Sequence, residues 1–385
     1  MKQHCLLSPS AAHRWLQCPP SVRICEEIPR ESSPFAEEGT LAHAVAAMSL
    51  KTALGMDVTA EREEIAASAL TVDETMERCA AEWAALITDR LAWWKLACGH
   101  TEAYALVERR VALTAGGHEI FGTADAIIVT DTAVEVYDYK YGLGVAVSAV
   151  ENRQMMIYAL GALCLSDGDP DEMTVRMTIF QPRIENLSEW EAPAPVLLSW
   201  QSGELAEKAA LAYDGKGELH CGAWCRFCAA RPQCHHCAAE YRKAWEEHRS
   251  PHLMTIAQIS ELLHVTGQIK QWAEAVETFA LARAMQGENY PGWKVVEGRG
   301  KRVIADAKGA ATALLEGGLA EAAIFKPREL QTITTLEALA GKKRFAQLCG
   351  DFIDKKPGNP KLAEDSDSRP TVNNNVFADL DTTNL

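Results

Sequence analysis

Hydrophobic and polar positions divide the chain into a helical beginning, a strand-rich middle and a second helical stretch. Apolar residues recur at helical spacing in the first hundred residues, which predicts one helix that begins at Pro34 and another over residues 60–98. Proline suits the first helical position, and Glu37 lies near the positive end of the helix dipole. Residues 1–30 predict a short helical entry that is interrupted by a proline pair.

The pattern changes at about residue 104, where apolar residues begin to alternate with polar ones. Three β-rich runs, separated by turn residues, predict an antiparallel meander over residues 104–113, 119–130 and 133–140. Periodicity also predicts several later elements, which are a helix over 150–165, a strand over 173–183, a helix over 196–213, a helix over 255–286, a hairpin over 292–303 and two small helices over 306–350.

Composition and charge narrow the class of protein. The 385 residues are 48% hydrophobic and carry a net charge of -15, values of a globular protein that does not coat nucleic acid by charge alone. An apolar run of the roughly 20 residues that span a bilayer is missing from the sequence, as is a secretory signal. We therefore expect a cytoplasmic protein without a membrane partner, whose 12 cysteines favour metal binding over disulfides.

Residues 133–140, "AVEVYDYK", place charged residues on an apolar strand face. Asp138 and Lys140 point the same way as Val134 and Val136, because side chains two apart share a face. Hairpin pairing with the preceding strand would bring Asp125 close to Asp138, and a divalent cation is the usual way to keep two adjacent carboxylates ionised. An isolated D-x-K is more often an exposed ion pair, with Asp125 then a turn residue.

Four motifs in order resemble the PD-(D/E)XK nuclease superfamily, and specifically its RecB-like branch. They are His43 on an upstream helix, Asp125 on the second core strand, Asp138-Tyr139-Lys140 on the third, and Gln154 with Tyr158 on the next helix. The resemblance implies a restriction-endonuclease-like α/β core, with a central mixed sheet flanked by helices. It also implies a metal-dependent DNA exonuclease.

The same resemblance implies a role for each residue. His43, Asp125, Asp138 and the backbone carbonyl of Tyr139 would ligate Mg²⁺ or Mn²⁺, and Lys140 would activate the attacking water. Gln154 and Tyr158, which lie four apart on one helical face, would contact the DNA backbone or the lysine. Glu108 is a further acidic candidate, although a surface glutamate beside two arginines fits that position equally well.

Residues 221–237, "CGAWCRFCAARPQCHHC", hold five cysteines in seventeen positions. Cys225, Cys228 and Cys234 have the spacing C-x2-C-x5-C, which leaves a four-ligand site one residue short. Zinc would find its fourth ligand locally; the candidates are Cys221, Cys237, His235 and His236. An iron-sulfur cluster takes four thiolates that can be distant in sequence.

The cysteine spacing resembles that of AddB-type and CRISPR-adaptation exonucleases, which hold a [4Fe-4S] cluster. The resemblance implies the ligands Cys18, Cys225, Cys228 and Cys234, so that the cluster staples the N-terminal helix to the end of the nuclease core. Zinc remains the alternative metal.

The whole chain also resembles a family of phage and prophage proteins grouped with these nucleases. We therefore expect a nuclease domain over residues 1–245, a helical C-terminal domain over 250–352 and a disordered tail over 353–385. The expected substrate is DNA that is single-stranded or has a free end, and the expected partner is a phage recombination protein. A zinc-bearing DNA-binding or scaffold protein without nuclease activity is the alternative.

Overall fold

A computed structural model describes residues 5–295, except for residues 27, 29–33, 97–98, 101, 145 and 248–253. All described elements belong to one compact unit, Met1–Arg299. The small helices expected over 306–350, the tail over 353–385 and most of the hairpin over 292–303 lie outside the described residues. The domain boundaries stay predictions.

A five-stranded mixed sheet of order β1-β2-β3-β4-β5 forms the centre of the fold. Its strands are β1 (Tyr104–Ala115), β2 (His118–Val129), β3 (Ala133–Tyr139), β4 (Thr174–Gln181) and β5 (Asn186–Pro193). The predicted antiparallel meander of β1, β2 and β3 is confirmed. Strand β4 runs parallel to β3 because the chain crosses over through α6 (Arg153–Leu163).

Strand β5 was not predicted from the sequence. It pairs antiparallel with β4 at the edge of the sheet, and its residues are mostly exposed or half-buried. An edge strand of this kind needs no apolar run, so its sequence lacks the hydrophobic alternation that marks the other four strands.

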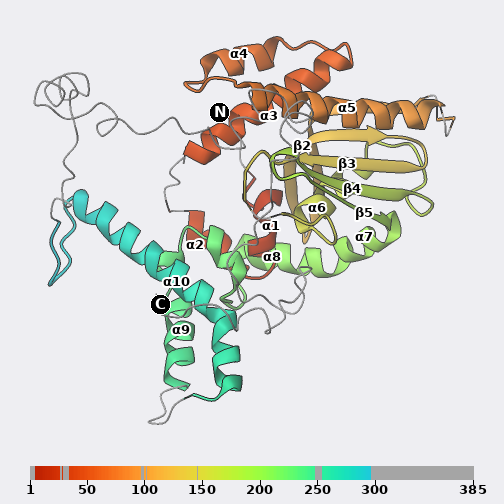
Figure 1. Ribbon diagram of the computed structural model, residues 1–385. Coiled ribbons are helices and arrows are strands. Elements are labelled where there is room, and N and C mark those ends of the chain that lie inside the picture. Colours follow the sequence, from red (N-terminus) through yellow and green to blue (C-terminus); the bar gives the residue numbers. More distant parts are fainter. Residues whose placement is uncertain are drawn as a thin grey trace, which may run out of the picture. The chain divides into compact units, whose positions relative to one another are not determined.

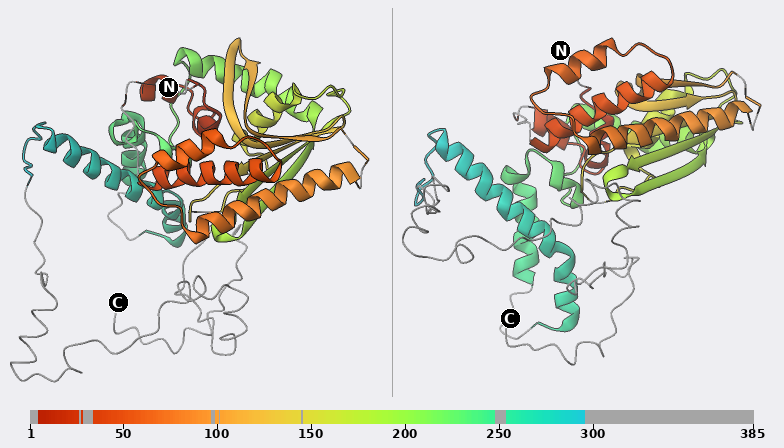
Figure 2. Two further views of the ribbon diagram at one scale, coloured as in Figure 1. Left: turned by 90° about the horizontal axis from the view of Figure 1, so that it is seen from above. Right: turned by 45° about the horizontal axis from the view of Figure 1, so that its top comes forward.

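Helices cover both faces of the sheet, which confirms the predicted α/β class with a central mixed sheet (Figure 1). One face packs against α3 (Pro34–Ala53) and α5 (Glu74–Leu96), which lie side by side (Figure 2). The other face packs against α6 and several shorter helices. The shorter helices on that side are η1 (Pro9–Ala11), α1 (Ala12–Trp15), α7 (Ala194–Trp200) and α8 (Ala206–Asp214).

Two predicted helices are each interrupted. The helix expected over 60–98 is two helices, α4 (Thr59–Ala67) and α5, because Asp73 accepts a hydrogen bond from the Met76 backbone N–H and caps a new helix. The helix expected over 196–213 is broken between α7 and α8 by the π-helical turn η3 (Gln201–Leu205). The remaining helical elements are α2 (Ser21–Glu26), η2 (Pro182–Ile184), η4 (Ala223–Phe227), η5 (Arg231–Gln233), α9 (His235–Glu247) and α10 (Ile256–Met285).

A buried ion pair fixes α5 to the sheet. Glu135 on β3 is 1% exposed and accepts hydrogen bonds from the Arg90 guanidinium, with Nε–Oε1 at 2.9 Å and Nε–Oε2 at 3.0 Å. The Tyr137 hydroxyl donates to Glu135 Oε2. The ion pair and the hydrogen bonds offset the cost of burying this carboxylate. No described helix is long and apolar enough to cross a membrane.

Candidate active site and cysteine-lined cavity

The site lies where the regular alternation of side chains in β1 and β2 is interrupted. Beyond this point, odd- and even-numbered residues of each strand point to the opposite sides of the sheet. In β1, Ala105 faces the α3–α5 side whereas Val111 faces the α6 side, and in β2 the same exchange separates Ala126 from Ala124. Glu108, between the two halves of β1, has φ +49, a left-handed conformation that glutamate rarely adopts. This local irregularity places the carboxylates of Glu108 and Asp125 together.

His43 joins these two carboxylates from α3. One ligand atom from each of His43, Glu108 and Asp125 lies within 4.8 Å of the other two, and His43 Nδ1 is 3.2 Å from Asp125 Oδ1. Burial disfavours the charged imidazole, but the Asp125 carboxylate outweighs burial and the pKa of His43 rises to about 9. The site is therefore strongly electronegative before any cation binds.

Asp138 lies next to this group at the end of β3. The β2–β3 register pairs Ala126 with Tyr137, so Asp125 and Asp138 follow as neighbours across the hairpin. The side chain of Asp138 is 6% exposed, and its Oδ2 atom lies 3.0 Å from Lys140 Nζ. Burial raises the pKa of Asp138, and the Lys140 ammonium opposes that rise.

Helix α6 contributes two polar side chains to the same place. Gln154 Nε2 donates to Asp138 Oδ1 at 3.0 Å, which leaves Oδ2 without a hydrogen bond of normal geometry among the described residues. Tyr158 is buried, and burial raises the pKa of its phenol, so it stays neutral. A Cβ atom on Gly122 would lie 2.8 Å from the Tyr158 ring, so β2 has no side chain at the one position where Tyr158 needs the space.

The backbone of Tyr139 on β3 forms a hydrogen bond with Asp125 on β2. Its N–H donates to Asp125 Oδ2 at 2.7 Å, whereas its side chain packs on the opposite face against Trp83 and Phe180. The structure thus brings together the residues that the sequence assigned to this site, and Glu108, the further acidic candidate, lies with them. Periodicity could not single out Glu108, because its contribution depends on a backbone conformation that no sequence motif marks.

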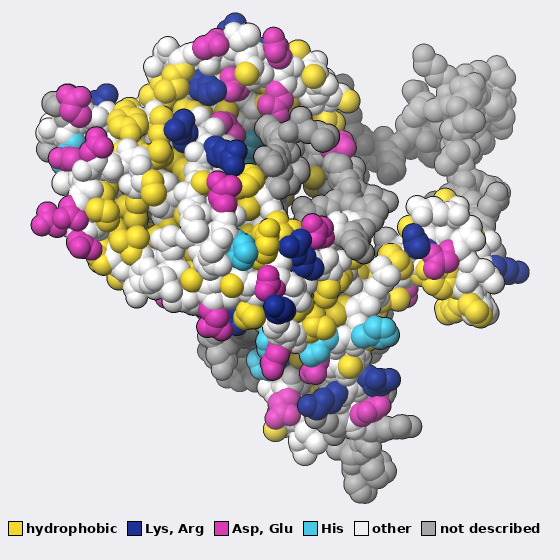
Figure 3. All heavy atoms as spheres, turned by 180° about the vertical axis from the view of Figure 1, so that it is seen from behind, with side chains coloured by type: hydrophobic (Ala, Val, Ile, Leu, Met, Phe, Trp, Pro, Cys, Tyr) yellow, Lys and Arg dark blue, Asp and Glu magenta, His cyan; other side chains and the backbone are white. Residues whose placement is uncertain are grey.

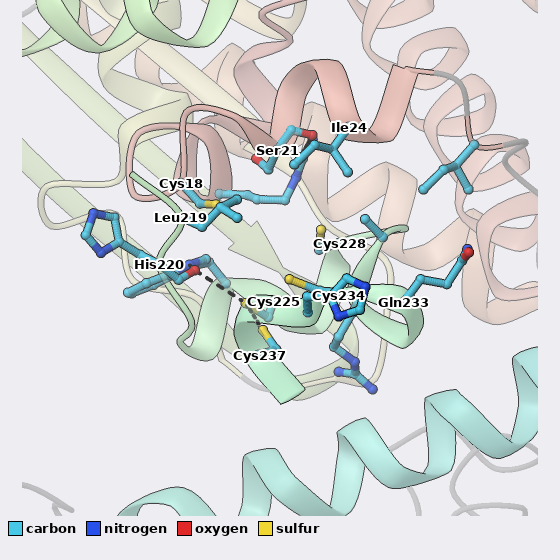
Figure 4. A pocket seen from close by; sticks show the side chains of 16 residues that line it. Cys18, Ser21, Ile24, Leu219, His220, Cys225, Cys228, Gln233, Cys234 and Cys237 are labelled. Atoms are coloured by element: carbon cyan, nitrogen blue, oxygen red, sulfur yellow. Dashed lines mark hydrogen bonds between the residues drawn. The ribbon is translucent and has the colours of Figure 1, made fainter. Parts of the chain in front are cut away.

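The four cysteines predicted to bind one cluster line a single cavity of about 470 Å³. Cys18 comes from the N-terminal segment, and Cys225, Cys228 and Cys234 come from the segment around η4 and η5 (Figure 4). The side chains of Cys18 and Cys225 are buried. Two parts of the chain about two hundred residues apart therefore meet at one group of thiols.

Three further cysteines belong to the same region: Cys237 also lines this cavity, and Cys221 and Cys25 lie next to cysteines that line it. The Sγ atoms of Cys221, Cys225 and Cys237 lie within 4.8 Å of one another, and Cys225 and Cys237 are 3.6 Å apart. Hydrogen bonds from the other two thiols lower the pKa of Cys221 to about 3. On the other side, Cys25 Sγ lies 3.6 Å from Cys228 Sγ.

The cysteine region has a small core of its own. Its buried members are Cys225, Cys237 and Tyr241, against which Ile269 and Trp272 of α10 pack. So few buried residues provide little hydrophobic stabilisation, and small units of this kind are commonly held by a metal.

Arg14 connects the cysteine region with the carboxylate site. Its side chain is 6% exposed, and Nη1 donates to the Ser21 carbonyl at 2.8 Å and contacts Cys25 Sγ at 3.5 Å. The same arginine lines the cysteine cavity and a second cavity of about 750 Å³ that Lys140 and Gln154 also line. The two cavities are neighbours.

The fold and site define a mixed α/β protein with a carboxylate–histidine–lysine site beside a cysteine-lined cavity. The chain belongs to the family described as "Protein of unknown function (DUF2800)", whose model matches residues 4–370.

Two solved structures are similar to this chain. The crystal structure of SSO0001 is 14% identical, with a TM-score of 0.29, over 62% of this chain and 89% of that one. A protein described as "Putative exonuclease" from Eubacterium rectale is 8% identical, with a TM-score of 0.35, over 66% of this chain and 92% of that one.

Proposed function

We propose that this protein is a Mg²⁺- or Mn²⁺-dependent DNA exonuclease of the PD-(D/E)XK type. One observation carries the proposal, which is the convergence of three carboxylates, an imidazole and a lysine at one place in the sheet. Glu108, Asp125 and Asp138 come from three consecutive strands, and His43 comes from a helix on one face. Because like charges so close together repel each other, the arrangement is best satisfied by a bound cation.

The donor atoms suit a hard divalent cation. Carboxylate oxygens are the ligands that Mg²⁺ and Mn²⁺ prefer, and imidazole is accepted as well. Asp138 Oδ2 is buried and pairs with the Lys140 ammonium 3.0 Å away, so this oxygen already faces a cationic group and could bind a metal cation at the same place. The residues that would hold the ion are His43, Glu108, Asp125, Asp138 and the backbone carbonyl of Tyr139.

Each side chain then has a distinct task in phosphodiester hydrolysis. A bound divalent cation would supply Lewis-acid stabilisation of the phosphate and acidify a water molecule. Lys140, held 3.0 Å from Asp138, would orient that water and stabilise negative charge as it develops on the phosphate. Gln154 fixes the orientation of Asp138, and the neutral Tyr158 phenol can donate a hydrogen bond to a backbone phosphate.

The cysteine cavity would hold a [4Fe-4S] cluster through Cys18, Cys225, Cys228 and Cys234. Support comes from the shared cavity, which these four cysteines line together with Cys237, and from the four thiolates that such a cluster takes as ligands. The cluster would be structural, since it would tie the N-terminal segment to the segment that follows the sheet.

The distribution of charge on the molecule favours contacts with a short part of a nucleic acid, such as its end, over contacts along its whole length. Acidic and basic side chains are interspersed on the face that Figure 3 shows, without one continuous basic surface. A protein with net charge -15 gains little from long-range attraction to DNA. We therefore propose a cytoplasmic enzyme that acts on single-stranded or free DNA ends, with a phage recombination protein as its partner.

The decisive experiment is a cleavage assay on end-labelled single-stranded and double-stranded DNA with Mg²⁺ or Mn²⁺. We expect degradation that stops on chelation and in the Lys140→Ala variant. Cleavage that persists unchanged in Lys140→Ala would remove this site from consideration. The labels also report polarity, because 5′- and 3′-labelled strands shorten differently.

A zinc-bearing DNA-binding or scaffold protein is the second candidate. The observation in its favour is the trio Cys221, Cys225 and Cys237, because a tetrahedral zinc site with Zn–S bonds of about 2.3 Å places sulfur atoms roughly 3.8 Å apart. Cys225 and Cys237 are already 3.6 Å apart. Stoichiometric zinc together with DNA binding but no metal-dependent cleavage would favour this candidate.

A further inference from the structure

A second cavity extends from the carboxylate site to the cysteine region. Its volume is about 750 Å³, within the range of about 300–1,000 Å³ that is typical of small-molecule sites. Lys140 and Gln154 line it from the side of the site, and Phe227 and Ala229 line it from the cysteine region. A substrate whose phosphate lies at Lys140 would therefore have its neighbouring groups in this cavity.

Phe227 has an unusual environment for a phenylalanine. The residue is 70% exposed, whereas Cys225 in the same short helix η4 is buried. The His13 ring meets it edge-on, with ring centroids 5.6 Å apart, and the Arg226 guanidinium lies 5.5 Å from its ring centroid. The ring is thus supported from two sides while much of its surface stays in water.

The polar lining of the same cavity is suited to a phosphate backbone. Arg14, Lys140 and Arg153 contribute positive charge, whereas Glu151 is the acidic residue among the lining side chains. Two of these cations are already partly engaged, because Lys140 pairs with Asp138 and Arg153 lies 3.8 Å from Glu204. The cavity therefore combines moderate positive charge with one exposed aromatic ring.

We propose that Phe227, supported by His13, is a stacking platform for an unpaired base next to the phosphate that is cleaved. Aromatic rings bind single strands by stacking on bases, and this contact tolerates every sequence because each base has a π-face. A base inside a duplex has both faces covered by its neighbours, so Phe227 selects a strand that is single or frayed at its end. The inference rests on the proposed nuclease function and assigns its strand preference to one residue.

Binding without cleavage tests this role directly. In EDTA, the full-length Phe227→Ala protein should bind a fluorescent single-stranded oligonucleotide about 5- to 150-fold more weakly, the loss expected for one base–aromatic stack of ~1–3 kcal/mol. Affinity for a covalently closed circular duplex, which has no end that could fray, should stay unchanged. Phe227→Trp should restore single-strand binding, which a merely structural role for Phe227 would not predict.

The control variant is Trp93→Ala, which removes another exposed aromatic side chain that does not line the cavity. It should bind single strands as the unchanged protein does. Phe227 lies between two cysteines, so its substitution could also disturb a bound metal. The metal content and the thermal unfolding of the Phe227 variants are therefore measured and must equal those of the unchanged protein. Substitution with a 2-aminopurine base adds a spectroscopic readout, since its fluorescence is quenched on stacking against Phe227.

Each outcome either supports or overturns the platform. Unchanged single-strand affinity in Phe227→Ala, equal losses for single strands and duplex, or no single-strand binding by the unchanged protein would each overturn it. Cleavage that proceeds normally while Phe227→Ala binds normally would sink the platform and leave the nuclease proposal intact. Phe227-dependent binding without any metal-dependent cleavage would support the platform and overturn the nuclease proposal.

Discussion

The Nδ1 atom of His43 lies 3.2 Å from the Oδ1 atom of Asp125, so a helix on one face of the sheet meets a strand at the carboxylate site. Asp125 is also held by the Tyr139 N–H at 2.7 Å. The same carboxylate thus faces a helix with one oxygen and the neighbouring strand with the other. Such two-sided support is what a preorganised metal ligand requires.

Loss of the Lys140 ammonium should abolish most cleavage without unfolding the protein. Removing one group that stabilises charge in the transition state typically lowers kcat by about 10²–10³, and the Lys140 side chain is 32% exposed, so its loss leaves no large cavity. Steady-state cleavage and thermal unfolding of Lys140→Ala measure the two effects. Lys216→Ala, which removes an exposed lysine paired with Asp214, is the control and should cleave normally.

Glu108 should contribute to cation binding. Glu108→Gln removes a negative charge from a group of ligand atoms that lie within 4.8 Å of one another, so we expect a higher Mg²⁺ concentration at half-maximal activity, by about 10-fold or more. Isothermal titration with Mn²⁺ measures the same affinity without cleavage. The exposed Glu102 offers a matched Glu102→Gln control, and an identical metal dependence in both variants would contradict a ligand role for Glu108.

Serine variants of individual cysteines should separate the two possible metals. If an iron-sulfur cluster occupies the cavity, Cys18→Ser should lose iron and the absorbance near roughly 400 nm, whereas Cys237→Ser should keep both. A zinc site at the trio predicts the opposite pattern, with zinc lost in Cys237→Ser and kept in Cys18→Ser. Elemental analysis of anaerobically purified protein decides between them, with Cys164→Ser as an exposed control.

The buried Glu135 should be a major source of stability. Glu135→Ala leaves Arg90, whose side chain is 22% exposed, without its carboxylate partner. Because only one member of the pair is fully buried, we expect a loss of about 1–3 kcal/mol of unfolding free energy. Urea unfolding followed by circular dichroism measures the loss. Glu191→Ala, which removes an exposed partner of Arg176, should cost under about 1 kcal/mol; equal losses in the two variants would contradict the buried anchor.

The parts of the site that follow from simple periodicity could be predicted from the sequence. Alternation along "EVYDYK" places Asp138 on the face of Val134 and Val136, and hairpin pairing places Asp125 beside it. Helical spacing brings Gln154 and Tyr158 to one face of α6. These relations depend only on the geometry of strands and helices.

Other features depend on exceptions to that geometry and could not be predicted. The sequence left Glu108 open as an acidic candidate or a surface glutamate, because its place in the site depends on its own left-handed backbone. Helix α5 starts where Asp73 caps it rather than where apolar residues begin. The spacing C-x2-C-x5-C does not include Cys221 or Cys237, so it could not show that both lie next to Cys225. Cys221 precedes η4 and Cys237 lies in the first turn of α9, and the fold brings the sulfur atoms of both within 4.8 Å of that of Cys225.

Arg14 gives the cysteine cavity an influence beyond its own stability. This nearly buried guanidinium holds the Ser21 carbonyl and touches Cys25 while lining the substrate-sized cavity beside Lys140. Any shift of the thiols would therefore move a cation at the border of this second cavity. Arg14 thus makes the position of a charge in one cavity depend on the arrangement of the thiols in the other.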